Sequence, residues 1–126
     1  MWQSPAMTYD LAVWEGVRPS DDAAAGRLFS ELYCRYIDID TGVDHPPTER
    51  MAAYVAALLQ RWPDMDEDED DSSPWCSGRL IDEASGPLIY FALRWSMAEE
   101  ASAYAAQLAA SMGLVCFDVS GDRLRP

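Results

Sequence analysis

Carboxylates dominate the chemistry available to this chain. Seven of the eight residues at 64–71 are acidic, and the 126 residues together hold 22 acids against nine arginines and no lysine, a net charge of −13. So dense a run cannot pack into a core, and residues 64–74 are expected to form a solvated acidic loop. The charge repels nucleic acid and anionic membranes and attracts basic proteins. The sequence therefore predicts a basic protein partner, and neither a nucleic-acid nor a membrane partner.

Two tryptophans flank this run, Trp62 before it and Trp75 after it. Aromatic side chains beside a charged rim are typical of protein-binding hot spots, although tryptophans also commonly fill cores. In the binding interpretation the acids steer a basic partner and the two rings anchor it. The residues predicted to bind the partner are Trp62, Asp66, Glu67, Asp68, Glu69, Asp70, Asp71 and Trp75.

A second group of carboxylates could hold a divalent cation. Asp38, Asp40 and Asp44 lie close together in a segment rich in turn-forming residues, and turn formation alone would also explain them. The longer acidic run is a poor calcium loop because it lacks the glycine and terminal glutamate of an EF-hand. His45, the only histidine, could at most pair with Cys76 as a thiol catalyst. Phosphate loops, nucleophile elbows and zinc-protease motifs do not occur in the sequence, so we predict no catalytic residue and no cofactor.

The three cysteines bear on the compartment. They cannot all pair within one chain, and Cys34 and Cys116 occur in apolar periodic segments, where free cysteine behaves as a small buried hydrophobic residue. No apolar stretch approaches the roughly 20 residues of a membrane-spanning helix, and the first residues lack the features of a secretory signal. We expect a cytoplasmic protein of one domain spanning 1–126, with residues 1–6 a flexible leader.

Strands are indicated by alternating or continuous apolar residues. Residues 9–14 alternate, and residues 88–95 are nearly all apolar, as is typical of a strand covered on both faces. Residues 80–81 and 114–119 are further candidate strands, separated from the others by turn residues and helices.

Helices are indicated by apolar residues at spacings of three and four. One follows Ser20, a second spans residues 48–62, and a third follows Ser96. Ser96 and Glu99 have the spacing of a capping box, and Gly113 would end the third helix in a left-handed conformation.

The resulting element order is βααββαβ. This order predicts an α+β protein, a two-layer sandwich compatible with the ferredoxin-like split βαβ arrangement, with a four-stranded sheet whose first and third strands are central. Another α+β layer fold with an antiparallel meander is the alternative.

Several strings carry a resemblance to other proteins: YDLAVWEG at 9–16, SPW at 73–75, SGPLIY at 85–90, WSMAEEA at 95–101 and GLVCFD at 113–118. They resemble an uncharacterised family of small acidic proteins of high-GC bacteria. In general style the chain is also similar to bacterial toxin-immunity proteins, which are small, acidic and α+β. Neither resemblance implies a role for any one residue.

Charge and aromatic residues together predict a non-enzymatic acidic protein-binding domain, as in an immunity protein that neutralises a basic toxin or nuclease. One alternative is a small-ligand or divalent-cation-dependent enzyme that uses a cleft at the end of the sheet. A second alternative is a structural subunit.

Overall fold

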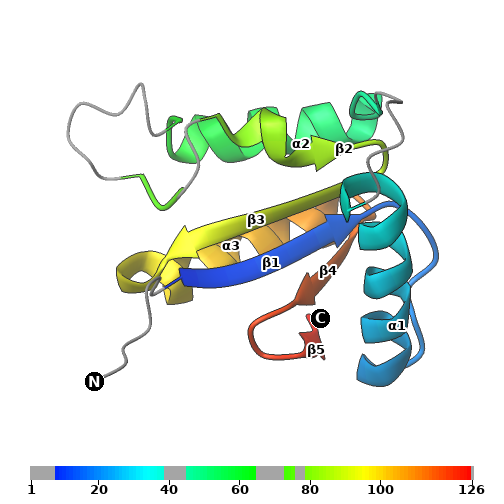
Figure 1. The fold of residues 1–126 in the computed structure, drawn as a ribbon. Coiled ribbons are helices and arrows are strands. Elements are labelled where there is room, and N and C mark those ends of the chain that lie inside the picture. The colour runs from blue at the N-terminus through cyan, green and yellow to red at the C-terminus, as the bar shows by residue number, and fades with distance from the viewer. Residues whose placement is uncertain (1–7, 39–44, 65–72, 76–78, 126) are drawn as a thin grey trace, which may run out of the picture.

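The structure of the chain is a computed structural model, and it describes residues 8–38, 45–64, 73–75 and 79–125. Strands, α-helices and shorter helical turns alternate along it (Figure 1). The elements are β1 (Thr8–Trp14), α1 (Asp22–Tyr33), the π-helical turn η1 (Cys34–Asp38), α2 (Glu49–Arg61), the 3-10 turn η3 (Leu80–Glu83), β2 (Ala84–Ser85), β3 (Leu88–Arg94), the 3-10 turn η4 (Trp95–Met97), α3 (Ala98–Ser111), β4 (Val115–Asp118) and β5 (Arg123–Leu124).

The strands of the described chain form one antiparallel sheet in the order β2-β3-β1-β4-β5. Strand β1 pairs along its whole length with β3, and its second half also pairs with β4. Leu11, for example, lies opposite Phe91 on one side and Asp118 on the other. The strands predicted at 9–14, 88–95 and 114–119 are therefore present as β1, β3 and β4.

Both faces of the sheet are apolar. Successive side chains of a strand point to opposite faces, and the central strands carry apolar residues at consecutive positions. In β1, Leu11 and Val13 join the cluster that packs against α2 and α3, whereas Ala12 and Trp14 join the cluster that packs against α1. All four are fully buried, and each large apolar side chain buried in this way contributes about 1.5–3 kcal/mol. Figure 1 shows α3 running behind β1 and β3, while α1 stands beside β4 and β5.

The α+β class is confirmed, but the finer prediction needs two corrections. The two-layer sandwich is wrong because helices cover both faces of the sheet, as the almost continuous apolar pattern of β3 requires. The four-stranded sheet is wrong because β5 pairs with β4 and adds a fifth strand. The strand predicted at 80–81 is the 3-10 turn η3, and the strand that pairs with β3 is the two residues that follow it, β2.

The helix ends show how local chemistry sets the element boundaries. Asp21 and Thr48 cap α1 and α2 by accepting hydrogen bonds from the backbone N–H groups of Ala24 and Met51. The capping box predicted at Ser96 does not form: Met97 is the N-cap of α3 without a side-chain bond, because the 3-10 turn η4 runs directly into the helix. Gly113 ends α3 at φ +74°, as predicted. Within the described part of the chain, no helix is long and apolar enough to cross a membrane.

Candidate functional site

The tryptophans predicted as partner anchors are core residues. Trp62 is 5% exposed and Trp75 fully buried, with their ring centroids 6.0 Å apart in an edge-to-face arrangement. The Trp75 indole N–H donates to the Trp62 carbonyl at 3.0 Å, and Phe91 of β3 packs against Trp75. The interpretation of these two rings as exposed anchors is therefore wrong, because they form the core contact that joins the end of α2 to the sheet.

Most of the acidic run at 64–71, including the predicted partner-binding residues 66–71, lies outside the described residues. Asp64, at its start, is half-buried, and its carboxylate accepts a hydrogen bond from the Leu80 backbone N–H at 2.8 Å. Ser73, just after it, is buried and donates to the Pro63 carbonyl at 2.6 Å. The two ends of the run are thus attached to the folded domain close to the end of α2.

The candidate cation ligands do not form a site that can be described. Asp38 ends the π-helical turn η1, while Asp40 and Asp44 lie outside the described residues. Among the residues that are described, no group of three or more His, Cys, Asp or Glu is placed to hold a metal ion. Cys76, the suggested partner of His45, also lies outside them, and His45 contacts the Tyr36 ring edge-on at 5.2 Å between centroids.

The cysteine prediction is half right. Cys116 is buried between the sheet and α3, and burial raises the pKa of its thiol to about 12, with Arg125 opposing that rise and Asp118 adding to it. Cys34 is exposed, contrary to the prediction. It lies where α1 passes into the π-helical turn, and the wider turn moves the residues out of the 3.6-residue register on which the prediction depended.

Two hollows in the surface gather polar and aromatic side chains. The first, of about 430 Å³, is called here the tyrosine–acid pocket, and its lining includes Tyr33, Tyr36, Tyr90, Asp82 and Glu83. The π-helical turn brings Tyr36 to the pocket, and the Tyr33 and Tyr90 rings meet edge-on at 5.6 Å between centroids.

Contacts from β2, the following turn and β3 hold the walls of this pocket in place. Ser85 donates to the Tyr36 carbonyl at 2.8 Å, and Gly86 adopts φ +56° directly against the Tyr36 ring. Tyr90 donates to Asp10 at 2.5 Å; burial, reinforced by this hydrogen bond, raises the pKa of its hydroxyl. The pocket therefore combines aromatic walls held by these contacts with two carboxylates in its lining.

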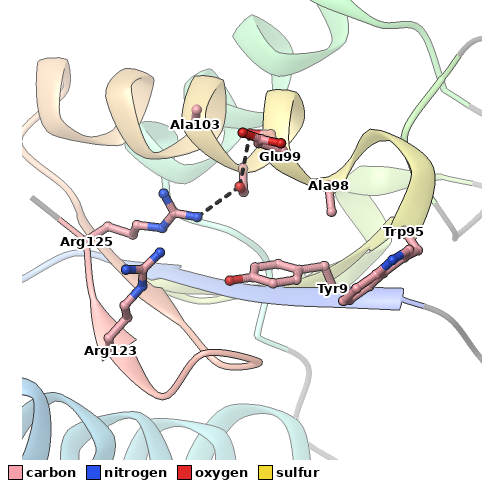
Figure 2. Close-up of a pocket in the computed structure, with 8 residues that line it drawn as sticks. Tyr9, Trp95, Ala98, Glu99, Ala103, Arg123 and Arg125 are labelled. Carbon is pink, nitrogen blue, oxygen red and sulfur yellow. Dashed lines mark hydrogen bonds between the residues drawn. The ribbon is translucent and has the colours of Figure 1, made fainter.

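The second hollow, of about 560 Å³, is called the arginine pocket. Figure 2 shows the two guanidinium groups at one end, the Trp95 indole at the other and the Tyr9 ring between them. Its lining is Tyr9, Trp95, Ala98, Glu99, Ser102, Ala103, Arg123 and Arg125. Small residues of α3 leave the space open, and 55% of Trp95 is exposed.

A buried carboxylate underlies the arginine pocket. Asp118 is fully buried and accepts hydrogen bonds from the Tyr9 hydroxyl and, at 2.7 Å, from the Gly121 N–H. Arg125 approaches the same carboxylate at 3.3 Å and Arg123 at 3.7 Å. Asp118 thus satisfies a buried charge by sharing it among several donors, as such groups require.

The two arginines differ in how fully the protein uses their donors. Arg125 is largely buried and donates to Ser102 Oγ at 2.9 Å, yet its Nε is buried with no hydrogen-bond partner among the described residues. Arg123 is 59% exposed and approaches Asp118 only through Nε. Burial, with the hydrogen bond to Asp118 adding to it, raises the pKa of the Tyr9 hydroxyl, so Tyr9 stays a neutral donor at ordinary pH.

Sequence reasoning missed the arginine pocket, although signals for it existed. Asp118 is an acid within an otherwise apolar strand pattern, and such a residue needs a buried partner. Arg123 and Arg125 are the only basic residues in a short stretch just after it. What the sequence did not reveal is that β5 folds back beside Tyr9, which lies more than a hundred residues away in the chain.

Comparisons with other proteins give no further guide to these pockets. No family model, curated protein or solved structure matches the chain. The pockets differ in sign, one rimmed by carboxylates and the other by guanidinium groups. They also lie on opposite faces of the sheet, because Tyr90 packs with the α1 cluster and Tyr9 with the α2–α3 cluster.

Proposed function

We propose that the protein is a non-enzymatic acidic binding domain for a basic protein. The observation that carries the proposal is the charge of −13, which is too large to come from the run at 64–71 alone. Exposed carboxylates on α1, α2 and η3 extend it over the folded domain. Such a field raises the rate of encounter with a positively charged partner and disfavours acidic ones.

The tyrosine–acid pocket supplies the specific part of this binding. An arginine or lysine side chain that enters it would lie against the Tyr33 and Tyr36 rings and reach the carboxylates of Asp82 and Glu83. A cation over an aromatic face gains about 0.5–2 kcal/mol, more when water is excluded. Pairing with a carboxylate adds geometric selectivity for a guanidinium group.

The pocket replaces the tryptophans in the binding hypothesis. Trp62 and Trp75 are buried in the core and do not contact the partner in this proposal. The anchor is instead a basic side chain of the partner, which enters the tyrosine–acid pocket. Residues 66–71 keep the role of steering, since long-range attraction depends on their charge and needs no fixed structure.

A blocked tetra-arginine peptide tests the pocket as a receptor for basic side chains. We expect Asp82→Asn combined with Glu83→Gln to weaken peptide binding about three- to tenfold more than Glu31→Gln combined with Glu49→Gln, measured by calorimetry in about 0.15 M salt. The control pair removes the same two charges from exposed sites outside the pocket. Equal weakening by the two double substitutions would show that peptide binding depends only on net charge. That result would contradict the proposed role of the tyrosine–acid pocket.

The steering role has its own test. Replacing residues 66–71 with serine and glycine should lower the association rate of the same peptide and flatten its dependence on salt, while the dissociation rate stays close to that of the wild type. Stopped-flow measurements at about 0.02 M and 0.2 M salt separate these quantities. An unchanged rate and unchanged salt dependence would contradict steering.

The finer proposal is that the partner is a basic toxin or nuclease that the protein neutralises. The test requires a basic toxin encoded beside the gene: co-expression of the protein with that toxin should restore growth. The double substitution in the tyrosine–acid pocket should abolish the rescue, and the control pair should preserve it. Absence of rescue by the wild-type protein would contradict the immunity role and leave the binding of basic side chains to the peptide experiment.

A further inference from the structure

The arginine pocket has no place in the binding of a basic partner. It presents two guanidinium groups on a protein that is otherwise strongly acidic, and they lie at one end of a hollow large enough for a small organic molecule. Arg123 and Arg125 come from β5 and the residue that follows it, and both are drawn to this position by the buried Asp118. The arrangement calls for a ligand of the opposite sign.

Donors left unused by the protein point to an oxyanion. The Arg123 guanidinium is exposed, approaches Asp118 at 3.7 Å through Nε and makes no hydrogen bond to another described residue. Guanidinium groups bind carboxylates and phosphates through paired, parallel N–H donors. An oxyanion at this end of the pocket would also lie close to the Tyr9 hydroxyl (Figure 2). Ser102, whose Oγ accepts a hydrogen bond from Arg125, belongs to the same lining.

The charge balance of the pocket favours one negative charge over two. Asp118 offsets one of the two arginines, and Glu99, in the lining, carries a further negative charge, so these four groups sum to zero. A dianion such as a phosphate monoester would place two additional negative charges beside Glu99, whereas a carboxylate places only one. A carboxylate held by the guanidinium groups is therefore repelled less.

The other end of the pocket has different chemistry. The Trp95 indole is half exposed and tilted at 48° to the Tyr9 ring, with 6.0 Å between the centroids, and the methyl groups of Ala98 and Ala103 form the α3 wall. An exposed tryptophan beside a second ring is a surface on which a flat apolar group packs well. A ligand that spans the pocket is therefore charged at one end and flat and apolar at the other.

We propose that the arginine pocket binds a small organic monoanion, a carboxylate attached to a flat apolar body. The carboxylate lies between the guanidinium groups of Arg123 and Arg125, and the body lies against Tyr9 and Trp95. This inference is independent of the proposed basic partner, because the two pockets use different residues on opposite faces of the sheet.

The probe for this test is 2-naphthoate, with 2-naphthamide as its uncharged analogue and 2-naphthyl phosphate as its dianionic analogue. For a ligand of this size the expected dissociation constant is about 0.1–1 mM. We expect the amide and the phosphate each to bind at least about fivefold more weakly than the carboxylate, measured by calorimetry and by shifts of the amide NMR signals of residues in β5 and the first turn of α3.

Two variants locate the site and one serves as a control. Arg123→Gln should weaken 2-naphthoate binding about fivefold or more, since it removes an exposed charge without disturbing the core. Ala103→Trp should block the pocket by filling it, because Ala103 is exposed and lines the cavity. Arg50→Gln changes the net charge by the same amount at an exposed position on α2 and should leave binding unchanged.

Several results would overturn the proposal. These are no saturable binding of 2-naphthoate at millimolar concentration, equal binding of the amide, tighter binding of the phosphate, or equal loss in Arg123→Gln and Arg50→Gln. Thermal unfolding of each variant checks that it is folded. If either Arg123→Gln or Ala103→Trp does not fold, the other variant tests the same cavity from its opposite wall. Failure here leaves the tetra-arginine peptide experiment untouched, so the two proposals fail separately.

Discussion

At the scale of single residues, Asp118 has the largest structural consequence. It is fully buried in β4, and four groups converge on its carboxylate: the Tyr9 hydroxyl, the Gly121 N–H and the two arginines. A buried charge is costly unless its partners remain in place, and removing one member leaves the others unpaired. The arginine pocket thus depends on a residue that does not line it.

We expect Asp118→Asn to lower the free energy of unfolding by about 2–4 kcal/mol, because Arg125 would lose its counter-charge in a largely buried position. Tyr9→Phe removes one hydrogen bond to the same carboxylate and should cost only about 1–2 kcal/mol. Urea denaturation of the two variants measures both values. If Asp118→Asn lowered the free energy of unfolding by less than Tyr9→Phe does, the central role of this carboxylate would be contradicted.

The raised pKa of the Cys116 thiol implies that the free energy of unfolding changes with pH in alkaline solution. The pKa of its thiol is raised by burial from an ordinary 9.0 to about 12 in the folded protein. Between these values the unfolded chain loses the proton while the folded protein keeps it, so stability falls as pH rises, by up to about 1.4 kcal/mol per pH unit from this group. The contribution is fully present below pH 9 and is lost above it.

Urea denaturation between pH 8 and pH 10.5, a range of about 2.5 units, should therefore show a steeper loss of stability in the wild type than in Cys116→Ala, by roughly 1–2 kcal/mol in total. Burial raises the pKa of Tyr9, Tyr54 and Tyr90 in both proteins, and the variant lacks only the smaller part of the Tyr54 rise that comes from Cys116. Cys34→Ala, which alters an exposed thiol, should follow the wild type. Identical slopes in wild type and Cys116→Ala would show that the Cys116 thiol is accessible to solvent.

At the scale of elements, the turn between β2 and β3 links the sheet to the tyrosine–acid pocket. Gly86 has φ +56°, a conformation that side chains disfavour, and a Cβ there would lie 3.0 Å from the Tyr36 ring. Its N–H and carbonyl also hydrogen-bond to His45 and Thr48, at the entrance of α2. The turn therefore fixes Tyr36 and the start of α2 at once.

Gly113 provides a matched comparison, since its φ is also positive but nothing lies within 4 Å of a Cβ added there. We expect Gly113→Ala to cost about 1–2 kcal/mol from backbone strain alone. Gly86→Ala should cost about 1 kcal/mol more, and should shift the ring signals of Tyr36 in NMR spectra. Equal costs and an unmoved Tyr36 would mean that the ring yields freely and does not form a rigid wall.

The elements also show which parts of the structure could be predicted. Strands β1 and β3 and helix α2 were predicted from periodicity because their burial follows the pattern of their own residues. The prediction of a strand at 80–81 is wrong because two apolar residues do not distinguish a strand from a 3-10 turn. The exposed Cys34 and the buried Trp62 and Trp75 depend on the π-helical turn and on packing between distant segments, and neither is encoded in a local spacing.

The two pockets could not be predicted from the sequence for the same reason. Each joins side chains from segments far apart in the chain, such as Tyr33 with Asp82 or Tyr9 with Arg125. Their composition could be read from the sequence, but their proximity is a product of the strand order. The acidic run is contiguous in the sequence and is therefore recognisable there, whereas the residues of the arginine pocket are brought together only by folding.

At the scale of the whole molecule, charge is the dominant property. A compact protein with a net charge of −13 repels itself, and unfolding relieves part of that repulsion by moving the charges apart. Added salt screens the repulsion, since the Debye length falls from about 30 Å at 0.01 M to about 8 Å at 0.15 M. The free energy of folding should therefore depend on ionic strength.

We expect the thermal midpoint to rise between about 0.01 M and 0.2 M sodium chloride, and to rise less in the variant whose residues 66–71 are serine and glycine. Choline chloride should act as sodium chloride does, because screening does not depend on the identity of the cation. Stabilisation by sodium alone would indicate a specific cation site, and a midpoint that falls with salt would show that attractive ion pairs outweigh the repulsion.

The position of β5 as the edge strand of the sheet has a consequence for the order in which the protein folds. Tyr9 lies in the first strand and Arg125 just beyond the last one, so the hydrogen bond from Tyr9 to Asp118 closes a separation of 109 residues. Contacts between such distant segments form late, after the entropy of closing the intervening chain has been overcome. A chain truncated before Arg123 would therefore lack the arginine pocket although β1, β3 and β4 are all present. A ligand of that pocket would distinguish molecules in which β5 has paired with β4 from those in which it has not.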